Sequence, residues 1–495
     1  MQPDIIIIGS GMGGATLAAA LAPSGRRIII LERGQRLEHS VEARDDAAIF
    51  ARGHFRPDEL WLDGAGKPFN PGNYYHPGGN SKFYGAVLMR YRAQDFTPLR
   101  HMGGTTPGWP ISYDILEPYY QAAENLYQVR GALGYDPTEP AHSGPYNFAP
   151  VPDEPPIADL RARLAAAGLH PSSLPLGVDI DRWLAHGKTP WDAFPDTCGG
   201  KMDAETVGLT HALQHPNVSL ITGCKVTRLL AQGGRVTAVE MQRDGRVERM
   251  SAPLIVLSAG AVVSAAILLA SADGIHPGGL ANTSGQVGRN FMNHNLTAVL
   301  GLHPLRRNTS VYQKTIQMND FYLTGGPAGE PLGNIQMLGK ISGTMMAADT
   351  PIPRAIAGWI ARHSVDLLAM SEDLPNPDSR VTLREGQIVL DWRRSNWQAH
   401  LELVKQLKRY LKKAGYPIVI AKTFDRKTPS HQCGTNRMGD DPATSVVTPD
   451  CRAHDLENLY IMDASVLPTS AAVNPALTIA ALALRCANHI KRRLA

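Results

Sequence analysis

The stretch "DIIIIGSGMGGATLAAALAPSGRRIIILERG", Asp4 to Gly34, decides the fold of this 495-residue chain. It opens with an unbroken β-branched run, Ile5 to Ile8, which is typical of a strand buried on both faces. A glycine-rich turn, a helix of small residues and leucines, and a second apolar run, Ile28 to Leu31, follow in that order. Strand, glycines, helix and strand together predict a βαβ unit and, with it, a parallel α/β sheet.

The turn carries a GxGxxG pattern at Gly9, Gly11 and Gly14. The first glycine permits the tight turn, the second lets a pyrophosphate approach the backbone, and the third lets the helix pack on the strand. Glu32 ends the second strand, where a carboxylate accepts hydrogen bonds from ribose hydroxyls. The unit therefore predicts a dinucleotide site but does not separate NAD from FAD. Glu32 disfavours NADP because it would repel a 2′-phosphate, although Arg33 beside it weakens that inference.

The composition is that of a globular protein, with 43% apolar and 19% charged residues and a net charge of +4. A chain of 495 residues exceeds one compact core, so we expect two domains. The five cysteines are scattered and form no CxxC pair, which argues against a disulfide scaffold, an iron–sulfur cluster and a metal site. The basic ending "KRRLA" is typical of a solvated helix end, so no nucleic-acid partner is expected.

The sequence also bears on the location of the protein. Nothing before "DIIIIGSG" resembles a basic leader or a twin-arginine signal. No apolar run approaches the ~20 residues that span a bilayer. We therefore expect a cytoplasmic protein with no membrane span.

The rest of the chain alternates between turn-rich and regular segments. Residues 40–76 hold many turn residues and aromatic side chains, which suits either an extended surface segment or a cover over a polar ligand. Residues 217–272 predict strands, a hairpin, a buried strand from Leu254 to Leu257 and a small-residue helix, in the same strand–turn–helix order as the N-terminus. Residues 290–425 alternate strand-like pieces with Gly/Pro loops and end in a helix from Trp397 to Ala414, which indicates an inserted, largely antiparallel sheet.

This organisation predicts an α/β fold, α+β overall, in which a Rossmann-like cofactor domain carries an inserted, largely antiparallel-sheet substrate-binding domain. We expect the first domain to combine residues 1–100, 200–290 and 430–495. The second domain would combine residues 101–199 and 291–429.

Three further segments stand out for their polar residues. They are "GGNS" from Gly78, "HQCGTNRMG" from His431 and "MDASVLPTSAAVNPALT" from Met462. Taken alone, His431 fits a turn residue, a metal ligand or a catalytic base. Asn474 and Pro475 fit the cap and the first position of the long helix that follows. The residues by themselves leave these alternatives open.

Together with the N-terminal unit, these segments resemble the glucose–methanol–choline (GMC) oxidoreductase family. Four anchors stand in the family's order and span nearly the whole chain: the GxGxxG with Glu32, "GGNS", "HQCGTNRMG" and "MDASVLPTSAAVNPALT". The "NPALT" ending and the layout look closest to the pyranose 2-oxidase and glucoside (C-glycoside) 3-oxidase branch. The resemblance implies an enzyme whose cofactor is FAD.

The resemblance also implies cofactor contacts, position by position. The N-terminal loop would hold the pyrophosphate, Glu32 would hold the adenosine ribose, and "GGNS" would lie along the flavin. The backbone at Val226 would contact adenine, and Ala259 would lie near the cofactor. Asp463 would bind a ribityl or phosphate-side group. The full set of implied cofactor residues is Gly9, Ser10, Gly11, Met12, Gly13, Gly14, Glu32, Arg33, Gly78, Gly79, Asn80, Ser81, Val226, Ala259, Asp463, Ala464, Asn474, Pro475 and Thr478.

Two positions depart from the family pattern. Some members link FAD covalently through a histidine four residues after the second glycine of the GG pair, where this chain has Phe83. His76 is nearby but precedes the glycines, so it is off the motif. Many members place an asparagine next, where this chain has Tyr84. We therefore expect non-covalent FAD and no flavin contact of the usual kind at Tyr84.

The reaction implied by the resemblance is oxidation of an alcohol carbon, with a hydride passing to flavin N5 and the hydroxyl proton to a base. His431 would be that base, since the pKa of a histidine lies near working pH. Asn474 would bind the same hydroxyl, and the helix after Pro475 would direct its N-terminus at the flavin edge that gains negative charge. We expect an FAD-dependent oxidoreductase that acts on CH–OH donors and oxidises a secondary hydroxyl, at C2 or C3, of a sugar or glycoside to a ketone.

Three other functions stay open at this point. They are a GMC oxidoreductase of a non-sugar alcohol, such as a sterol or an aryl alcohol, a flavin-bound lyase that cleaves cyanohydrins, and an NAD dehydrogenase. The sequence leaves open whether oxygen or another electron acceptor reoxidises the flavin. It allows an accessory subunit but does not require one.

Overall fold

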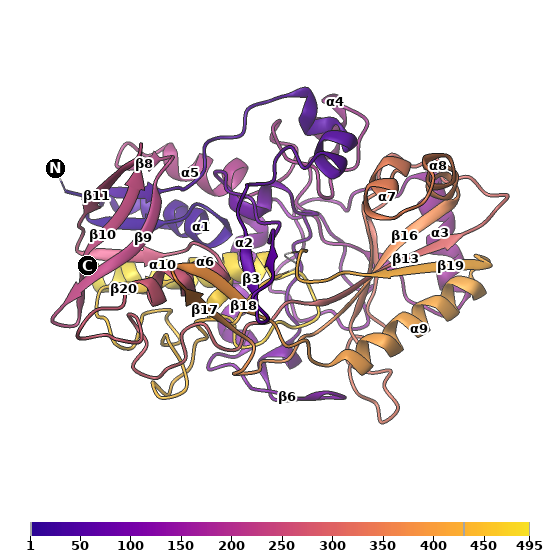
Figure 1. Cartoon of the computed structure of the whole chain (residues 1–495). Coiled ribbons are helices and arrows are strands. Elements are labelled where there is room, and N and C mark those ends of the chain that lie inside the picture. The colour runs from indigo at the N-terminus through magenta and orange to yellow at the C-terminus, as the bar shows by residue number, and fades with distance from the viewer. Residues whose placement is uncertain (1, 429–430, 495) are drawn as a thin grey trace.

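The computed structural model describes residues 2–428 and 431–494. Five parallel strands form a sheet at the end of the molecule where the N-terminus lies (Figure 1). The strand order is β20, β12, β1, β2, β8, with bounds Leu459–Ile461, Leu254–Leu257, Ile5–Ile8, Ile28–Leu31 and Val218–Ile221. Every neighbouring pair is parallel. The central place of β1 explains its four consecutive isoleucines, because both of its faces are covered. The predicted Rossmann-like α/β architecture is thereby confirmed.

Helix α1 (Met12–Leu21) packs against the C-terminal helix α10 (Ala476–Leu494), which also packs against α2 (Tyr113–Leu126). In Figure 1 the yellow α10 therefore lies beside the indigo N-terminal elements. Small residues permit this approach: a Cβ on Gly13 would collide with the carbonyl oxygen of Met462, and one on Gly14 with that of Gly9. The glycines of the N-terminal turn thus bring distant parts of the chain into contact.

A six-stranded antiparallel sheet lies at the other end of the molecule (Figure 1). Its order is β19, β13, β16, β15, β14, β7, with bounds Ile418–Thr423, Asn295–Leu302, Ser364–Ser371, Asn334–Met337, Ile316–Met318 and Ser172–Ser173. Helix α9 (Trp397–Lys413) covers it with an apolar face that includes buried Leu407 and Leu411. Gly415, with φ of 89°, follows the helix.

Part of the segment 40–76 departs from the sequence-based expectation. This segment forms two short strands, β3 and β4, and Trp61 on β3 is only 1% exposed. A buried tryptophan belongs to the core, so it is neither a surface residue nor free to cover a ligand. The hairpin of residues 380–391, which lies within the predicted insertion 290–425, also pairs with β3 rather than with the six-stranded sheet. The resulting four-stranded sheet has the order β17, β18, β3, β4, with bounds Arg380–Arg384, Gln387–Asp391, Trp61–Asp63 and Pro68–Phe69.

Smaller elements complete the fold. A three-stranded antiparallel sheet and a two-stranded one contain β9 (Lys225–Gln232), β10 (Arg235–Arg243), β11 (Arg246–Met250), β5 (Leu99–His101) and β6 (Gly104–Thr106). The remaining α-helices are α3 (Pro155–Ala166), α4 (Ile180–Ala185), α5 (Thr210–Leu213), α6 (Ala261–Ala270), α7 (Gly343–Asp349) and α8 (Arg354–His363). Among the described residues, none of the helices has both the length and the apolar character needed to cross a bilayer. Residues 1, 429, 430 and 495, which fall within the predicted domain bounds, lie outside the described residues.

Candidate cofactor and active site

The GxGxxG turn leaves space beside one of its glycines. Gly9 adopts φ of 99°, and a Cβ there would collide with Ser258, so this glycine is required by the tight turn. A Cβ on Gly11, in contrast, would meet no atom within 4 Å. A Cβ built on Gly79 would lie 3.5 Å from the Cα of Gly11, which places the "GGNS" segment across the turn. The open position at Gly11 is therefore bounded by both predicted cofactor segments.

Glu32 lies at the end of β2 and is 6% exposed. Its carboxylate accepts hydrogen bonds from the backbone N–H and hydroxyl of Ser10, at 3.1 and 2.5 Å, and from the Gly34 N–H at 2.9 Å. Burial raises the pKa of Glu32 above its ordinary value, while the hydrogen bonds oppose that shift. The Ser10 hydroxyl also accepts from the Gly78 N–H at 3.3 Å, so Ser10 connects the acid to the second glycine segment.

The side chains of the "GGNS" segment hold the segment itself. The Ser81 hydroxyl donates to the Gly78 carbonyl at 2.6 Å and accepts from the Ala204 N–H at 3.0 Å. Asn80 accepts from the Tyr74 N–H at 2.9 Å. Lys82 follows and is buried in an ion pair with Asp203 at 3.1 Å. These contacts fix the backbone of the segment across the turn.

Asp463 follows β20 and reaches the start of helix α6. Its carboxylate accepts from the Gly260 N–H at 3.0 Å, the Ser264 hydroxyl at 2.6 Å and the Ser465 N–H at 2.8 Å. Burial raises the pKa of Asp463. Asp463 thus joins the segments that carry Ala259 and Ala464, and a Cβ on Gly260 would meet no atom within 4 Å.

Val226 and Arg33 are two further residues of the implied cofactor set. Val226 is on β9, just after Cys224, whose N–H donates to the Glu32 carbonyl at 2.9 Å, so Val226 lies near the acid end of β2. Arg33 bonds Glu59 at 3.1 Å and stacks on Tyr75, which engages its guanidinium within the 40–76 segment.

Thr478 lies in the first turn of α10, and its hydroxyl pairs with that of Tyr120 on α2 at 2.7 Å. This contact engages the hydroxyl within the protein. Met12 begins α1, where it is buried together with Gly13 and Gly14. Pro475 directly precedes the first residue of α10.

His431 and Asn474 are brought together by the fold. The Nε2 atom of His431 lies 3.2 Å from Nδ2 of Asn474, and both residues are partly buried. His431 has φ of 68°, in the left-handed region that few histidines adopt. Asn474 stands two residues before the first residue of α10. Burial lowers the pKa of His431 well below its ordinary value, so the ring is neutral at neutral pH.

A second histidine, His294, contacts His431 and was not found by the sequence-based reasoning. An antiparallel bridge pairs Met292 with Cys433, and continuing this register places His294 opposite His431. The two Nδ1 atoms lie 2.7 Å apart. The Nε2 atom of His294 lies 3.0 and 2.8 Å from the carbonyl oxygens of Ser470 and Ala471. Burial lowers the pKa of His294 to about 4, so this ring is neutral as well.

Asn474 is held from its other side by a chain of amides. Gln336 on β15 donates to Oδ1 of Asn474 at 3.0 Å and to Oδ1 of Asn334 at 3.0 Å. Asn334 donates to Asn319 at 2.7 Å, and Asn319 donates to the carboxylate of Asp136 at 2.6 Å. All three amides are buried. The chain therefore connects the six-stranded sheet to the start of α10.

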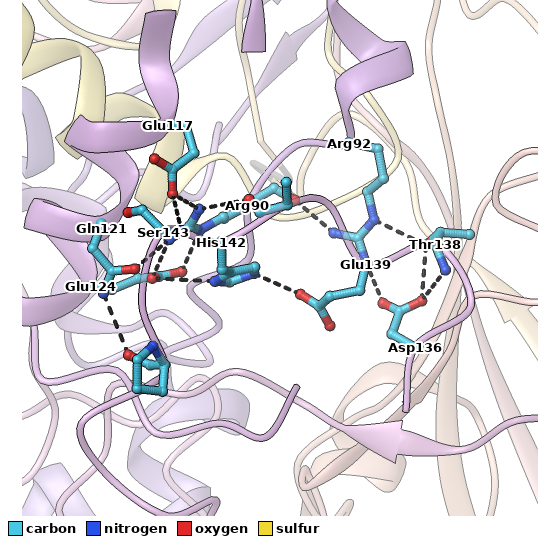
Figure 2. Close-up of polar contacts among 12 residues, drawn as sticks. Arg90, Arg92, Glu117, Gln121, Glu124, Asp136, Thr138, Glu139, His142 and Ser143 are labelled. Carbon is cyan, nitrogen blue, oxygen red and sulfur yellow. Dashed lines mark hydrogen bonds and ion pairs between the residues drawn. The ribbon is translucent and has the colours of Figure 1, made fainter. Parts of the chain in front are cut away.

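The amide chain ends at a buried ion pair. Arg92 bonds Asp136 at 2.5 Å, and Figure 2 shows the two side chains facing each other beside Thr138. In the same view, Arg90 lies between Glu117 and Glu124, at 2.9 and 2.7 Å. Paired buried charges of this kind cost much to break, so they give the chain a fixed end.

Comparison with known proteins identifies the family. Residues 187–296 and 375–483 match models described as GMC oxidoreductase, and residues 7–47 match an NAD(P)-binding Rossmann-like domain. The chain is 30% identical to 6'''-hydroxyparomomycin C oxidase of Streptomyces lividus, over 99% of this chain and 92% of that protein. The chain belongs to the GMC oxidoreductase family.

A further relative and a solved structure are also similar to this GMC oxidoreductase. It is 30% identical to paromamine 6'-oxidase of Streptomyces fradiae, over 98% of this chain and 91% of that protein. Its fold is similar to that of pyridoxine 4-oxidase from Mesorbium loti, with a TM-score of 0.68 and 20% identity over 99% of both chains. The predicted family and the predicted class, a flavoprotein enzyme that acts on CH–OH donors, are thereby confirmed.

The residues of this GMC oxidoreductase fit a flavin dinucleotide. Helix α1 follows Gly11 and has no side-chain cap. Its first N–H groups are therefore available to an anion, and the open position at Gly11 leaves room for a phosphate to approach. At the start of α6, in contrast, the Gly260 N–H already donates to the carboxylate of Asp463. Glu32, the residue expected to hold a ribose, bonds Ser10 within this turn. Among residues 2–428 and 431–494, no group of three or more His, Cys, Asp or Glu is arranged to hold a metal ion.

Proposed function

We propose that this GMC oxidoreductase oxidises a secondary hydroxyl of a sugar or glycoside, at C2 or C3, to a ketone. The observation that carries this proposal is the pair of His431 Nε2 and Asn474 Nδ2, one acceptor and one donor side by side. A secondary hydroxyl that displaces this direct contact would donate to the histidine and accept from the amide. Curated relatives named as oxidases of aminoglycosides support a carbohydrate substrate.

His431 acts as the general base in this proposal. Its ring is neutral because burial disfavours the imidazolium, so Nε2 offers a lone pair to the hydroxyl proton. Asn474 orients the hydroxyl oxygen and stabilises the negative charge that develops on it. General-base assistance is worth ~10²–10⁴ in rate. Bound FAD supplies the two-electron acceptor for the hydride from the carbinol carbon.

We infer that FAD is held without a covalent bond. Phe83 occupies the position at which some family members carry the linking histidine, and its ring stacks on Tyr74 with centroids 3.6 Å apart. A phenylalanine offers no nucleophilic atom. Residues 1–100, 200–290 and 430–495 would form the cofactor domain, and the remainder would form the substrate domain. Acid precipitation tests the linkage: the flavin should remain in the supernatant, and a yellow pellet would contradict non-covalent binding.

A hydroxyl at position 6 is the second candidate, because the names of two relatives place the oxidised group at position 6' or within a 6'''-hydroxy sugar. Position 6 of a hexopyranose carries a primary alcohol, which gives an aldehyde rather than a ketone. Nothing in the pair of His431 and Asn474 separates a primary from a secondary hydroxyl. The oxidised carbon must therefore be read from the product.

The test is an anaerobic screen of the purified yellow protein. The panel contains free sugars, methyl glycosides, paromamine, an aryl alcohol, a sterol and a cyanohydrin, and the readout is bleaching of the flavin, followed by NMR of the product. A ring ketone supports the first candidate and an aldehyde the second. Bleaching by the aryl alcohol or the sterol alone would replace the sugar by another alcohol. Cyanohydrin cleavage without bleaching would indicate a lyase, and a colourless protein an NAD enzyme. Admission of oxygen then shows whether oxygen or another acceptor reoxidises the flavin.

A further inference from the structure

We propose that His294 is a positioning residue that holds His431 in the tautomer with its proton on Nδ1, which keeps Nε2 free as the base. The proposal deepens the proposed function and rests on it for the role of His431 as base. The arrangement of protons in the two rings can be tested without any substrate.

The outer end of the histidine pair, at Nε2 of His294, fixes the position of one proton. Nε2 of His294 faces two carbonyl oxygens, those of Ser470 at 3.0 Å and Ala471 at 2.8 Å. Carbonyl oxygens only accept, so the nitrogen between them must carry the proton. His294 is 2% exposed, and burial keeps its ring neutral. A neutral imidazole has one N–H, so Nδ1 of His294 bears a lone pair.

The lone pair on Nδ1 of His294 determines which nitrogen of His431 carries its proton. Its Nδ1 atom lies 2.7 Å from Nδ1 of His294, which is a hydrogen-bond distance. Two lone pairs would repel each other there, and one of the two nitrogens must donate. His294 has already used its single proton, so His431 donates from Nδ1. Its own single proton is then spent, and Nε2 becomes the acceptor.

The amide chain constrains the same atom, Nε2 of His431, independently and from the side of Asn474. The carboxylate of Asp136, paired with Arg92, only accepts, so the amide of Asn319 must present its NH₂ group to it. The oxygen of Asn319 therefore accepts from Asn334, and the oxygen of Asn334 accepts from Gln336. Gln336 also donates to the oxygen of Asn474, which leaves the NH₂ group of Asn474 facing His431. A donor on Asn474 requires a lone pair at Nε2 of His431, as the histidine pair supplies.

The energetic consequence follows from the geometry. Without a partner at Nδ1, the amide of Asn474 is the one constraint left on the tautomer of His431 among the contacts of the described residues. A ring that carries its proton on Nε2 could not take a proton from a substrate. Holding a catalytic histidine in the wrong tautomer lowers the rate by up to ~10⁴ in a serine-protease triad. The geometry of substrate binding would change little, so kcat should fall while KM stays nearly constant.

Nitrogen-15 NMR of the histidine-labelled holoenzyme tests the arrangement directly. Signals are assigned by comparison with the variants His431→Gln and His294→Asn. The expected result near neutral pH is a protonated Nε2 on His294 and a protonated Nδ1 with an unprotonated Nε2 on His431. The opposite tautomer of His431 in the wild type would overturn the proposal. If the tautomers are as expected but no alcohol bleaches the flavin, the proposed function fails and the proton arrangement stands.

Variants then test whether His294 causes this tautomer. His294→Leu removes the acceptor and should lower the rate of flavin reduction by ~10²–10⁴ with mixed tautomers at His431. His294→Asn keeps an acceptor oxygen near the former Nδ1 and should recover at least about tenfold of that loss. His400→Leu is the matched control, because His400 is also buried but bonds Thr297 and Ser371 instead. The proposal would be overturned if His431 kept the single wild-type tautomer in His294→Leu. It would also be overturned if His400→Leu lowered the rate of flavin reduction as much as His294→Leu does. If a variant does not fold, the tautomers seen in the wild-type spectrum decide.

Discussion

Nδ2 of Asn474 lies 3.2 Å from Nε2 of His431, across a separation of 43 residues in the chain. The two atoms come from different surroundings. The histidine stands two residues before Cys433, which forms an antiparallel bridge with Met292, and the asparagine stands two residues before the helix α10. Each is held on its far side by a separate hydrogen-bonded chain, so the position at which a substrate hydroxyl would bind is fixed from both directions.

Replacing the base gives the first prediction. His431→Ala should leave a folded, yellow protein but lower the rate of anaerobic flavin reduction by ~10²–10⁴, because the hydroxyl proton then has no acceptor. Stopped-flow absorbance of the flavin measures this rate. A rate within a few-fold of the wild type would remove His431 from the role of base.

The orientation of the Asn474 amide gives the second prediction. Gln336→Glu replaces the NH₂ group that contacts Asn474 with a carboxylate oxygen, which cannot donate when it is ionised. The Asn474 amide should then turn its own NH₂ toward Glu at that position and its oxygen toward His431. We expect a loss of kcat greater than that caused by Gln336→Met, which removes the contact without reversing it. Equal kcat values for the two variants would contradict this account of the amide chain.

The open position at Gly11 gives the third prediction. Gly11→Ala adds a methyl group that meets no protein atom within 4 Å, so Tm of the apoprotein should change by no more than about 2 °C. The same methyl group would occupy the space through which a pyrophosphate approaches, and the affinity for FAD should fall by at least about tenfold. Flavin fluorescence titration measures the affinity.

Gly13→Ala is the matched control for that experiment. A Cβ at Gly13 collides with the carbonyl oxygen of Met462, so this variant should lower Tm even without the cofactor. If Gly11→Ala lowers Tm of the apoprotein as much as Gly13→Ala does, the position at Gly11 is not an open cofactor contact.

The lowered pKa of His431 gives a prediction about pH. Burial is the main cause, and the nearby His294 and Lys314 act in the same direction. The base form is the neutral ring, so the rate should not fall as pH drops through the ordinary histidine pKa of about 6.5. It should fall only at the lower pKa of the folded protein. Flavin-reduction rates measured between about pH 8 and pH 5 check this, and a limb at about 6.5 or above would contradict it.

His294 gives a prediction about acid stability. Its pKa is lowered to about 4 in the folded protein, so below about pH 6.5 the unfolded chain binds a proton that the folded chain does not. Stability is therefore lost as pH falls from about 6.5 toward 4. In His294→Asn, the drop in the free energy of unfolding between about pH 7 and pH 4.5 should be smaller by about 2 kcal/mol than in the wild type. Urea unfolding at both values measures the difference, and equal drops would contradict the lowered pKa.

Much of the fold was predictable because its signals are local. The isoleucines of β1 and β2, the glycines between them and the apolar face of α9 each lie within one short segment, and each element formed within a few residues of its expected place. The segment 40–76 was not predictable. Trp61 and its neighbours pair with β18, more than 300 residues away, and no local pattern specifies such a partner.

The sequence by itself determined the βαβ unit, the glycine turn with Glu32, the family and the two polar residues His431 and Asn474, because each is carried by residue types at fixed short spacing. Only the tertiary structure decided which atoms of those residues face each other. His294 reaches His431 through strand register, and Asp136 reaches Asn474 through three amides, two of them on β15 of the six-stranded sheet. Register and packing bring together residues that are distant in the chain, so the protonation of His431 is a property of the folded molecule.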